Sequence, residues 1–395
     1  MSEINASNFK KEHGDLAPDL VGVTELTSPY FFVPPSGTTA ERPQDCEPGT
    51  LRFNTDIGSL EVFRGKTIGW EQIQRRESQY LGGDFVSSNG GDSSNFGTGT
   101  RLLIFGGNTN PGNLNNIDFA TLESKGNAQD FGDLTETYPF GSDGACSSSV
   151  RALTSGANND NVDFVTIASL GNGAAFGDYH GNMQSGACSN NTRGLFAGGY
   201  NPQPSIVDTI SFFTISQLGD SVDFGNLESD NRGIASFAST TRGVFAGGTG
   251  GAPSYTNKNV IQFVTIATTG NTTDFGDLIN AIDFGAGASN ATRGIIAGGR
   301  DDPSSPGNTN VIQFVTIATT GNAIEFGDLN ETMAEFSGSA SRIEAAFSGG
   351  SPNSSTMKNT IEFVTIATTG NAQDFGDLTA AKYHASSTSS GHGGI

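Results

Sequence analysis

Residues 259–278 read NVIQFVTIATTGNTTDFGDL, and the chain repeats this stretch twice more with few changes, at 310–329 and 359–378. Looser copies occupy residues 117–134, 162–179 and 210–227. The phenylalanine of the FGD motif falls at positions 131, 176, 224, 275, 326 and 375, in steps of 45, 48, 51, 51 and 49 residues. A period of this length is typical of a repeat architecture, so the repeat decides the fold before any single residue does.

Each copy follows two shorter motifs. An apolar run that opens with arginine and ends in two glycines occurs at residues 101–107, 193–199, 242–248 and 293–299, with looser versions at 151–156 and 342–350. A stretch of Gly, Ala and Ser precedes the arginine, as in GACS at residues 186–189. β-Branched and aromatic residues dominate the arginine-led and IQFVTI runs, and Gly, Asn, Asp and Pro separate the runs, so we expect strands.

One unit therefore contains four strands: a small Gly/Ala/Ser strand, the arginine-led strand, the IQFVTI strand and the DFGDL segment. Four antiparallel strands repeated about every 50 residues describe a β-propeller blade. The innermost strand of a blade lies at a crowded axis, which explains its small residues, and the paired glycines permit positive φ or close backbone approach. The sequence predicts an all-β, six-bladed β-propeller over residues 99–395.

The strand count indicates how the ring would close. The last small strand, near residues 383–389, has no arginine-led strand after it because the chain given ends at Ile395. The first arginine-led strand, at Arg101, has no small strand before it unless residues 95–100 supply one. We favour pairing of the two ends, which covers two exposed strand edges at once. The alternative is a loose C-terminal tail.

Composition and charge exclude several classes of protein. The formal net charge of −21 argues against nucleic acid as a partner, because phosphate binding needs a positive surface. The 55 glycines are about twice the usual share, in agreement with many tight turns. No apolar run is long enough to span a membrane, and no hydrophobic segment follows Lys10 and Lys11, so we expect neither membrane insertion nor a signal peptide. Cys146 and Cys188 share one register and are expected in small inner strands.

Residues 1–78 differ from the rest of the chain in their sequence pattern. The prolines of TSPYFFVPPSG at residues 27–37 exclude a helix there. Short runs at residues 49–55, 60–64 and 68–73 are separated by Gly and Asp, and predict a small β-meander. A unit this small has little core of its own, so we expect it to pack against the propeller, against copies of itself or against a larger assembly. Residues 79–98 are the expected linker into the propeller.

Two resemblances add to this interpretation. A glycine pair, a gap, an apolar strand and an aromatic-bearing strand follow one another over about residues 85–395, and this order resembles the Kelch repeat, although Phe stands where Kelch repeats carry Trp. PPSGTTAERP, followed by GTLRFNTDIGSLEVFRGKTIGWEQI, resembles attachment segments of tail-fibre and other virion proteins of tailed bacteriophages. The FVTIATTGNAxDFGDL repeats are similar to those in structural proteins of phages that infect marine cyanobacteria. The resemblances imply a virion component with Kelch-like repeats.

Charged residues recur in step with the repeat, and we expect a structural role for them. The arginines are Arg101, Arg193, Arg242 and Arg293, with Arg151 and Arg342 in the looser copies, and the acids are Asp133, Asp178, Asp277, Asp328 and Asp377. We expect the acids to cap turns and the arginines to pair with carboxylates within or between blades. A calcium site needs six or more oxygens at one point, and equivalent positions far from an axis do not bring them together. We therefore expect no metal and no cofactor.

The residues that an enzyme would need are scattered. The four histidines, His13, His180, His384 and His392, occupy unrelated registers, and no Ser/His/Asp arrangement accompanies them. The DFG motif recurs once per repeat without a phosphate-binding lysine, which favours a role in a turn over kinase chemistry. We expect His180 and His384 to be solvated loop residues and the protein not to be an enzyme.

The segments between each glycine pair and the next long strand differ most between repeats. Loops on a rigid scaffold are where binding specificity usually lies. Tyr200, Tyr255 and Arg300 lie in these segments and are candidate contacts for a glycan or a protein ligand. The alternative is that they are ordinary solvated loop residues.

The predicted function is that of a non-enzymatic phage virion protein, assembled in the host cytoplasm and oligomeric within the particle. Residues 1–78 would dock on other virion proteins, and the propeller would contact a host-surface glycan or protein, or decorate the shell. The alternatives are a Kelch-like cellular interaction scaffold and a propeller-type carbohydrate-binding protein or enzyme.

Overall fold

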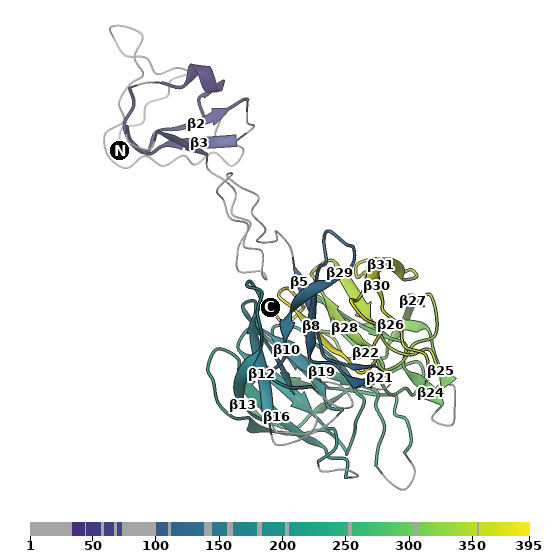
Figure 1. Ribbon diagram of the computed structural model, residues 1–395. Coiled ribbons are helices and arrows are strands. Elements are labelled where there is room, and N and C mark those ends of the chain that lie inside the picture. Colours follow the sequence, from purple (N-terminus) through teal and green to yellow (C-terminus); the bar gives the residue numbers. More distant parts are fainter. Residues whose placement is uncertain are drawn as a thin grey trace, which may run out of the picture. The chain divides into compact units, whose positions relative to one another are not determined.

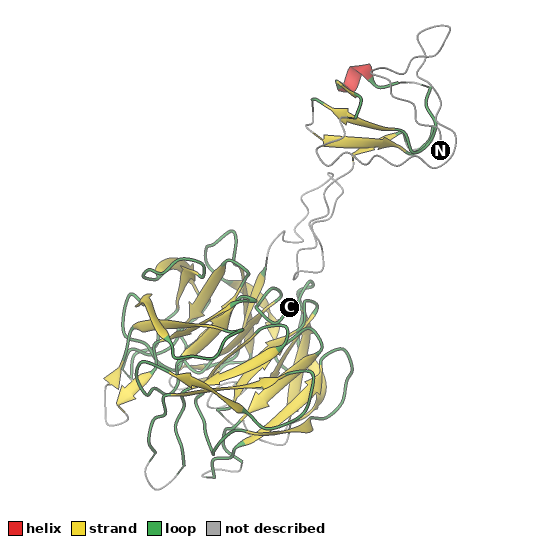
Figure 2. Ribbon diagram, turned by 180° about the vertical axis from the view of Figure 1, so that it is seen from behind, coloured by secondary structure: helices red, strands yellow, loops and turns green. Residues whose placement is uncertain are grey.

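The computed structural model describes residues 34–43, 45–56, 59–66, 69–72, 100–109, 112–137, 144–155, 161–179, 184–201, 205–251, 255–302, 307–353 and 355–395. The chain divides into two compact units, Met1–Glu77 and Ser78–Ile395. Apart from one turn of 3-10 helix, η1 (Thr39–Glu41), the described residues form strands and loops (Figure 2). The predicted linker at 79–98 and His180 lie outside the described residues. None of the described helical residues forms a segment long and apolar enough to cross a membrane.

The first unit contains one four-stranded sheet. Its strands are β1 (Ser36–Gly37), β2 (Leu51–Asn54), β3 (Ser59–Phe63) and β4 (Trp70–Gln72). They are joined in this order, with β1 parallel to β2 and the other pairs antiparallel. The predicted meander of three short strands corresponds to β2, β3 and β4. Because Phe63 is the one buried hydrophobic side chain among this unit's described residues, its core is small.

The second unit is built from six four-stranded antiparallel sheets (Figure 1). The innermost strands are β10 (Ala145–Ser147), β14 (Gly186–Ser189), β18 (Ala235–Ala238), β22 (Ala286–Ser289), β28 (Ser337–Ala340) and β32 (Ser386–Ser389). Each contacts the next in this order, and β32 also contacts β10. The crowding explains the small residues, because a Cβ on Gly287 would lie 2.4 Å from the carbonyl oxygen of Ser236 in the neighbouring strand.

The outer three strands of each sheet follow the order predicted from the repeat. The second strands are β5 (Arg101–Phe105), β11 (Arg151–Ser155), β15 (Arg193–Ala197), β19 (Arg242–Ala246), β23 (Arg293–Ala297) and β29 (Glu344–Ser348). The third strands are β8 (Asn116–Thr121), β12 (Asn161–Thr166), β16 (Thr209–Thr214), β20 (Val260–Thr265), β26 (Val311–Thr316) and β30 (Thr360–Thr365). The fourth strands are β9 (Gln129–Asp133), β13 (Ala174–Asp178), β17 (Val222–Asn226), β21 (Thr273–Asp277), β27 (Ile324–Asp328) and β31 (Gln373–Asp377). Two small hairpins, β6 (Asn108–Thr109) with β7 (Gly112–Asn113) and β24 (Arg300–Asp302) with β25 (Gly307–Asn308), lie in the variable loops.

One sheet combines the two ends of the second unit. Strand β32 pairs with β5, with Ser386 opposite Phe105 and Ser389 opposite Leu102. The inner position beside β5 is thus taken by the C-terminal strand, as the strand count favours. This pairing covers the inner edge of β5 and the outer edge of β32.

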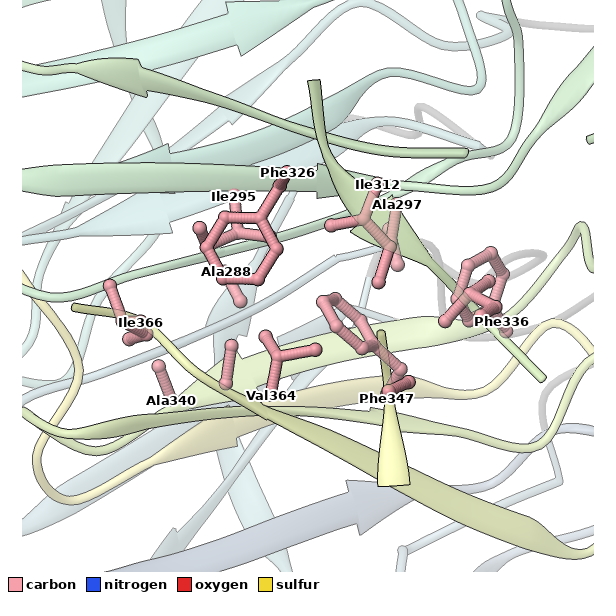
Figure 3. Close-up of a cluster of buried hydrophobic side chains, with 14 of the residues drawn as sticks. Ala288, Ile295, Ala297, Ile312, Phe326, Phe336, Ala340, Phe347, Val364 and Ile366 are labelled. Atoms are coloured by element: carbon pink, nitrogen blue, oxygen red, sulfur yellow. The ribbon is translucent and has the colours of Figure 1, made fainter. Parts of the chain in front are cut away.

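The hydrophobic core lies between neighbouring sheets. In the cluster drawn in Figure 3, side chains of β23 and β26, such as Ile295 and Ile312, meet Phe347 and Val364 of the next sheet. Phe326 of β27 lies in the same cluster. Five similar clusters of buried side chains occupy the other interfaces. Burial on both faces explains why the IQFVTI strands carry apolar residues at most positions.

The DFGD motif lies inside the outermost strand rather than in a turn. In β21 the pairing with β20 shifts register between Ile261 and Gln262, next to Gly276, whose φ is 147°. A Cβ on Gly276 would lie 2.5 Å from the carbonyl oxygen of Gly321 in the next sheet. The expectation of a turn is wrong because this glycine permits close approach of two sheets and does not reverse the chain.

The turn between the third and fourth strands of each sheet bonds to the FGD strand of the preceding sheet. This turn reads TTGN in three of the six sheets, and its bond is here called the TTGN contact. The N–H of Gly321 donates to the carbonyl of Phe275 (2.7 Å), and the N–H of Asp277 donates to Oδ1 of Asn322 (3.1 Å). Equivalent main-chain to side-chain bonds join Asp133 to Asn172, Asp178 to Asp220, Asn226 to Asn271, Asp328 to Asn371 and Asp377 to Asn127. The contact that repeats therefore uses the main chain of these aspartates and not, as expected, their side chains as turn caps.

Candidate functional site

The recurring arginines bind the next sheet through a main-chain carbonyl. Nη1 of Arg293 donates to the carbonyl of Ile366 (2.7 Å), and its guanidinium lies over the ring of Phe314, 4.3 Å from the centroid. The same bond joins Arg101 to Ile167, Arg151 to Ile215, Arg193 to Ile266 and Arg242 to Ile317. The predicted pairing with carboxylates is wrong for these five arginines, because the guanidinium satisfies a carbonyl just past the end of a strand.

The sixth position carries the opposite charge. Glu344, not Arg342, begins β29 and is the counterpart of Arg293. Its carboxylate accepts a bond from Nζ of Lys125 in the next sheet (2.5 Å), and this ammonium lies 4.0 Å from the centroid of the Phe363 ring. A cation over a phenylalanine is thus kept at every interface, although the sixth cation comes from the neighbouring sheet.

The variable loops lie at one end of the six sheets, where each innermost strand begins. Asp283, just before β22, forms a bridge with Arg300, just after the glycine pair, and Arg232 forms the equivalent bridge with Thr249. Tyr200 and Arg300 therefore lie at the same end, which we call the loop face. Tyr255 belongs to the same set of loops, is 38% exposed and has no described contact with the other two candidates.

An arginine–aromatic cluster occupies this face. The guanidinium of Arg232 lies 5.0 Å from the ring centroid of Tyr200 and 5.3 Å from that of Phe284. The guanidinium of Arg300 lies 4.4 Å from the centroid of Phe284. Arg300 also makes a two-bond contact with the buried carboxylate of Asp283, at 2.9 Å and 2.8 Å. Two of the three predicted contact residues, Tyr200 and Arg300, are thus brought into one cluster through Arg232 and Phe284.

Glu335 and His384 extend the cluster toward the axis. Oε1 of Glu335 lies 3.5 Å from Nη1 of Arg300 and 3.7 Å from Nε2 of His384. The His384 ring also packs edge-on against Phe284, with centroids 5.5 Å apart. Its side chain is 11% exposed, so the expectation of a solvated loop histidine is wrong. Burial lowers the pKa of His384, more than the nearby Glu335 raises it, and the ring is neutral at pH 7.

Before five of the innermost strands, the described residue two positions ahead of the strand belongs to a ring around the axis, here called the mouth ring. Its members are Gln184, Gly233, Phe284, Glu335 and His384, all with left-handed φ between 53° and 63°. The N–H of each later member donates to the carbonyl of the one before it, at 2.8–3.0 Å. Four members are not glycine, and a left-handed non-glycine residue costs about 1–3 kcal/mol, a strain that concentrates at functional sites.

The mouth ring surrounds a cavity of about 110 Å³ that opens toward the loop face. The innermost strands and the side chains of Gln184, Phe284, Glu335 and His384 line it. A second cavity of about 40 Å³ lies deeper, among the innermost strands and His392. The repeat analysis missed the mouth ring, because its residues share a position and differ in type. A fixed two-residue spacing before each small strand is the signal that could have found it.

The arrangement is suited to binding. Aromatic, amide, imidazole and carboxylate residues line a concave surface that the innermost strands hold in place, and Arg232 and Arg300 contact two of these residues from outside the lining. Within the described residues, no group of three or more His, Cys, Asp or Glu side chains is placed to hold a metal ion. The repeat positions Arg101, Arg193, Arg242 and Arg293 lie between sheets, away from this cluster.

The fold has counterparts among solved structures. The structure of YjhT matches it with a TM-score of 0.54, over 65% of this chain and 89% of that chain, at 11% sequence identity. At this identity the similarity concerns the fold alone. No protein-family model and no curated protein matches the sequence. The chain is thus an all-β protein with four-stranded antiparallel sheets in a propeller-like arrangement.

Proposed function

We propose that this chain is a non-enzymatic virion protein of a tailed bacteriophage. It docks on the particle through residues 1–78 and displays a binding face for the host surface. The observation that carries the proposal is the difference between conserved and variable repeat positions. Contacts between sheets repeat almost unchanged, whereas the arginine–aromatic cluster on the loop face uses Tyr200, Arg232, Phe284 and Arg300 once each.

The displayed domain in this proposal is a six-bladed, Kelch-like β-propeller. Each innermost strand contacts the next, from β10 through β14, β18, β22 and β28 to β32 and back to β10, which supports six blades around one axis. The TTGN contact supports the same arrangement, because Asp377 and Asn127 make it between the two ends of the unit. A rigid ring of this kind holds loops from all blades on one face.

The first unit has the properties of a docking module. Glu61 is fully buried and accepts bonds from Arg42 (2.7 Å to Oε2) and Asn54 (3.1 Å). The bond from Arg42 lowers the pKa of Glu61 against the opposing effect of burial. With Phe63 as its buried hydrophobic residue, the unit depends on charged contacts, and a partner surface would add the apolar burial it lacks.

The proposal is tested by purifying phage particles and identifying their proteins by mass spectrometry. We expect the chain among the structural proteins. A chain lacking residues 1–78 should keep the unfolding transition of the second unit but be absent from particles. Particles that contain the shortened chain at the normal level would refute docking through the first unit, and absence of the full chain from particles would refute the virion role.

A further inference from the structure

The cavity inside the mouth ring is large enough for a small organic molecule. Its volume is about 110 Å³. A water takes up about 30 Å³ of liquid, so this volume corresponds to about four waters. An engineered apolar cavity of about 150 Å³ binds benzene, so a ligand seated here is no larger than a single six-membered ring.

The lining selects an uncharged ligand that makes many hydrogen bonds. Glycine, alanine and serine of the innermost strands supply most of the wall. Among the lining residues that the structure describes, the ionisable side chains are those of Glu335 and His384. His384 is neutral, and the charge of Arg300 is matched by Asp283. An anion would meet the Glu335 carboxylate in a chain of net charge −21.

Glu335 keeps hydrogen-bonding capacity for such a ligand. Its distances to Arg300 (3.5 Å) and His384 (3.7 Å) exceed the roughly 2.7–2.9 Å of a strong charged hydrogen bond. The side-chain amide of Gln184 also lies at the mouth, where its Oε1 accepts from Arg232 (2.6 Å). Carboxylate, imidazole and amide groups around a polar hollow are a suitable set for neighbouring hydroxyl groups.

The C-terminal residues close the other end of the axis. Nε2 of His392 lies 3.1 Å from the carbonyl of Ser147 and 3.2 Å from Oγ of Ser189, and Gly393 donates to the carbonyl of Ser289 (2.8 Å). A Cβ on Gly394 would overlap the carbonyl oxygen of Ser189. The tail thus bonds to three different innermost strands and leaves the cavity open at the loop face.

We propose that this cavity is a one-ended binding site for one neutral sugar residue of a larger glycan, held by Glu335, His384 and Gln184. The chain of the glycan leaves through the loop face, where Tyr200 and Arg232 lie. This inference rests on the proposed display function and specifies its ligand class.

The test is saturation-transfer NMR on the full chain with methyl glycosides of glucose, galactose, mannose and N-acetylglucosamine, and with N-acetylneuraminic acid as an anionic probe. We expect at least one neutral glycoside to bind and the anionic sugar to bind less. Glu335→Gln should weaken binding about tenfold, as expected for a lost charged hydrogen bond. Glu331→Gln is the matched control, because Glu331 pairs with Lys358 outside the cavity lining and should leave affinity unchanged.

Three results would overturn the inference: no binding of any neutral glycoside, binding that Glu335→Gln leaves unchanged in a folded protein, or tighter binding of the anionic sugar. The thermal transition of each variant shows whether it is folded. Mass spectrometry of particles tests the virion role independently, so the ligand class can fail while the display function stands.

Discussion

A fully buried ion pair joins the two ends of the second unit, and its removal is the most direct test of how these ends are held together. Nζ of Lys382 lies 3.0 Å from Oδ2 of Asp118, and both side chains are 0% exposed. Asp118 belongs to β8, and Lys382 lies four residues before β32. Oδ1 of Asp118 also accepts from Thr379 (2.6 Å) and Asn116 (2.8 Å).

Lys382→Met removes the cation and leaves the carboxylate of Asp118 buried and unpaired. Breaking a buried pair from one side costs about 3–5 kcal/mol. At about 2–4 °C per kcal/mol for a unit of this size, the melting temperature should fall by at least about 6 °C. The loss should be largely recovered in the double variant Lys382→Met/Asp118→Leu, since replacing both partners by apolar residues is often close to neutral.

The assay is differential scanning calorimetry of the full chain, with Lys358→Met as the matched control. Nζ of Lys358 lies 2.7 Å from Glu331, but these side chains are 29% and 37% exposed. A pair of this kind contributes about 0–1 kcal/mol. If Lys382→Met lowered the melting temperature no more than Lys358→Met does, the pair of Lys382 and Asp118 would not be what holds the two ends of the second unit together.

Three further predictions follow from individual contacts. Gly276→Ala should lower the unfolding free energy by roughly 1–3 kcal/mol in urea titrations. The new Cβ would lie 2.5 Å from the carbonyl oxygen of Gly321, and the φ of 147° disfavours alanine. An unchanged urea midpoint would contradict the close approach of the two sheets. Arg293→Met should lower the unfolding free energy by about 1–2 kcal/mol in the same assay, because it removes the bond to Ile366 and the contact with Phe314. An unchanged unfolding free energy would show that the repeated arginine has no structural role. Burial lowers the pKa of His392 to about 4, against about 6.5 in the unfolded chain. The unfolded chain therefore binds the proton first, and the contribution of the neutral ring to the unfolding free energy is complete above about pH 6.5. This free energy should fall by up to about 3 kcal/mol as the pH drops to about 4. Unfolding measured across this pH range should lose that part of its pH dependence in His392→Asn, and an identical profile would show that the tail does not bury the ring.

The architecture was predictable because the strands carry their own signals. The 45–51-residue period, the small strand and the paired glycines predicted four strands per unit, and the missing partner of the last small strand predicted its pairing beside Arg101. The partner of each repeated arginine was not predictable, because it is a main-chain carbonyl and no residue type marks it. The register of the sixth copy was missed for a related reason: Arg342 lies two residues before the charged position, which Glu344 fills.

The candidate site was predictable only in part. Variable loops pointed to Tyr200 and Arg300, which lie on the loop face. Phe284, Glu335 and His384 were missed because a Phe, a Glu and a His share no chemistry. What they share is a left-handed backbone conformation two residues before a small strand. This conformation belongs to the position in the fold and does not depend on the side chain. His384 shows the consequence, since a loop position in sequence becomes a largely buried position once five such residues surround one axis.

The repeated residues and the variable residues of the second unit have different structural roles. The angle between neighbouring sheets is fixed by the TTGN contact, by the cation over phenylalanine and by close approach at glycine. An error at one interface would prevent the two ends from meeting. Where Glu344 replaces the repeated arginine, Lys125 of the next sheet supplies the cation. Mouth-ring residues join neighbouring sheets through backbone bonds, which do not depend on the type of side chain. Their side chains are therefore free to differ, and a ligand contacted by Gln184, Phe284, Glu335 and His384 would meet four different groups from four sheets although the scaffold repeats.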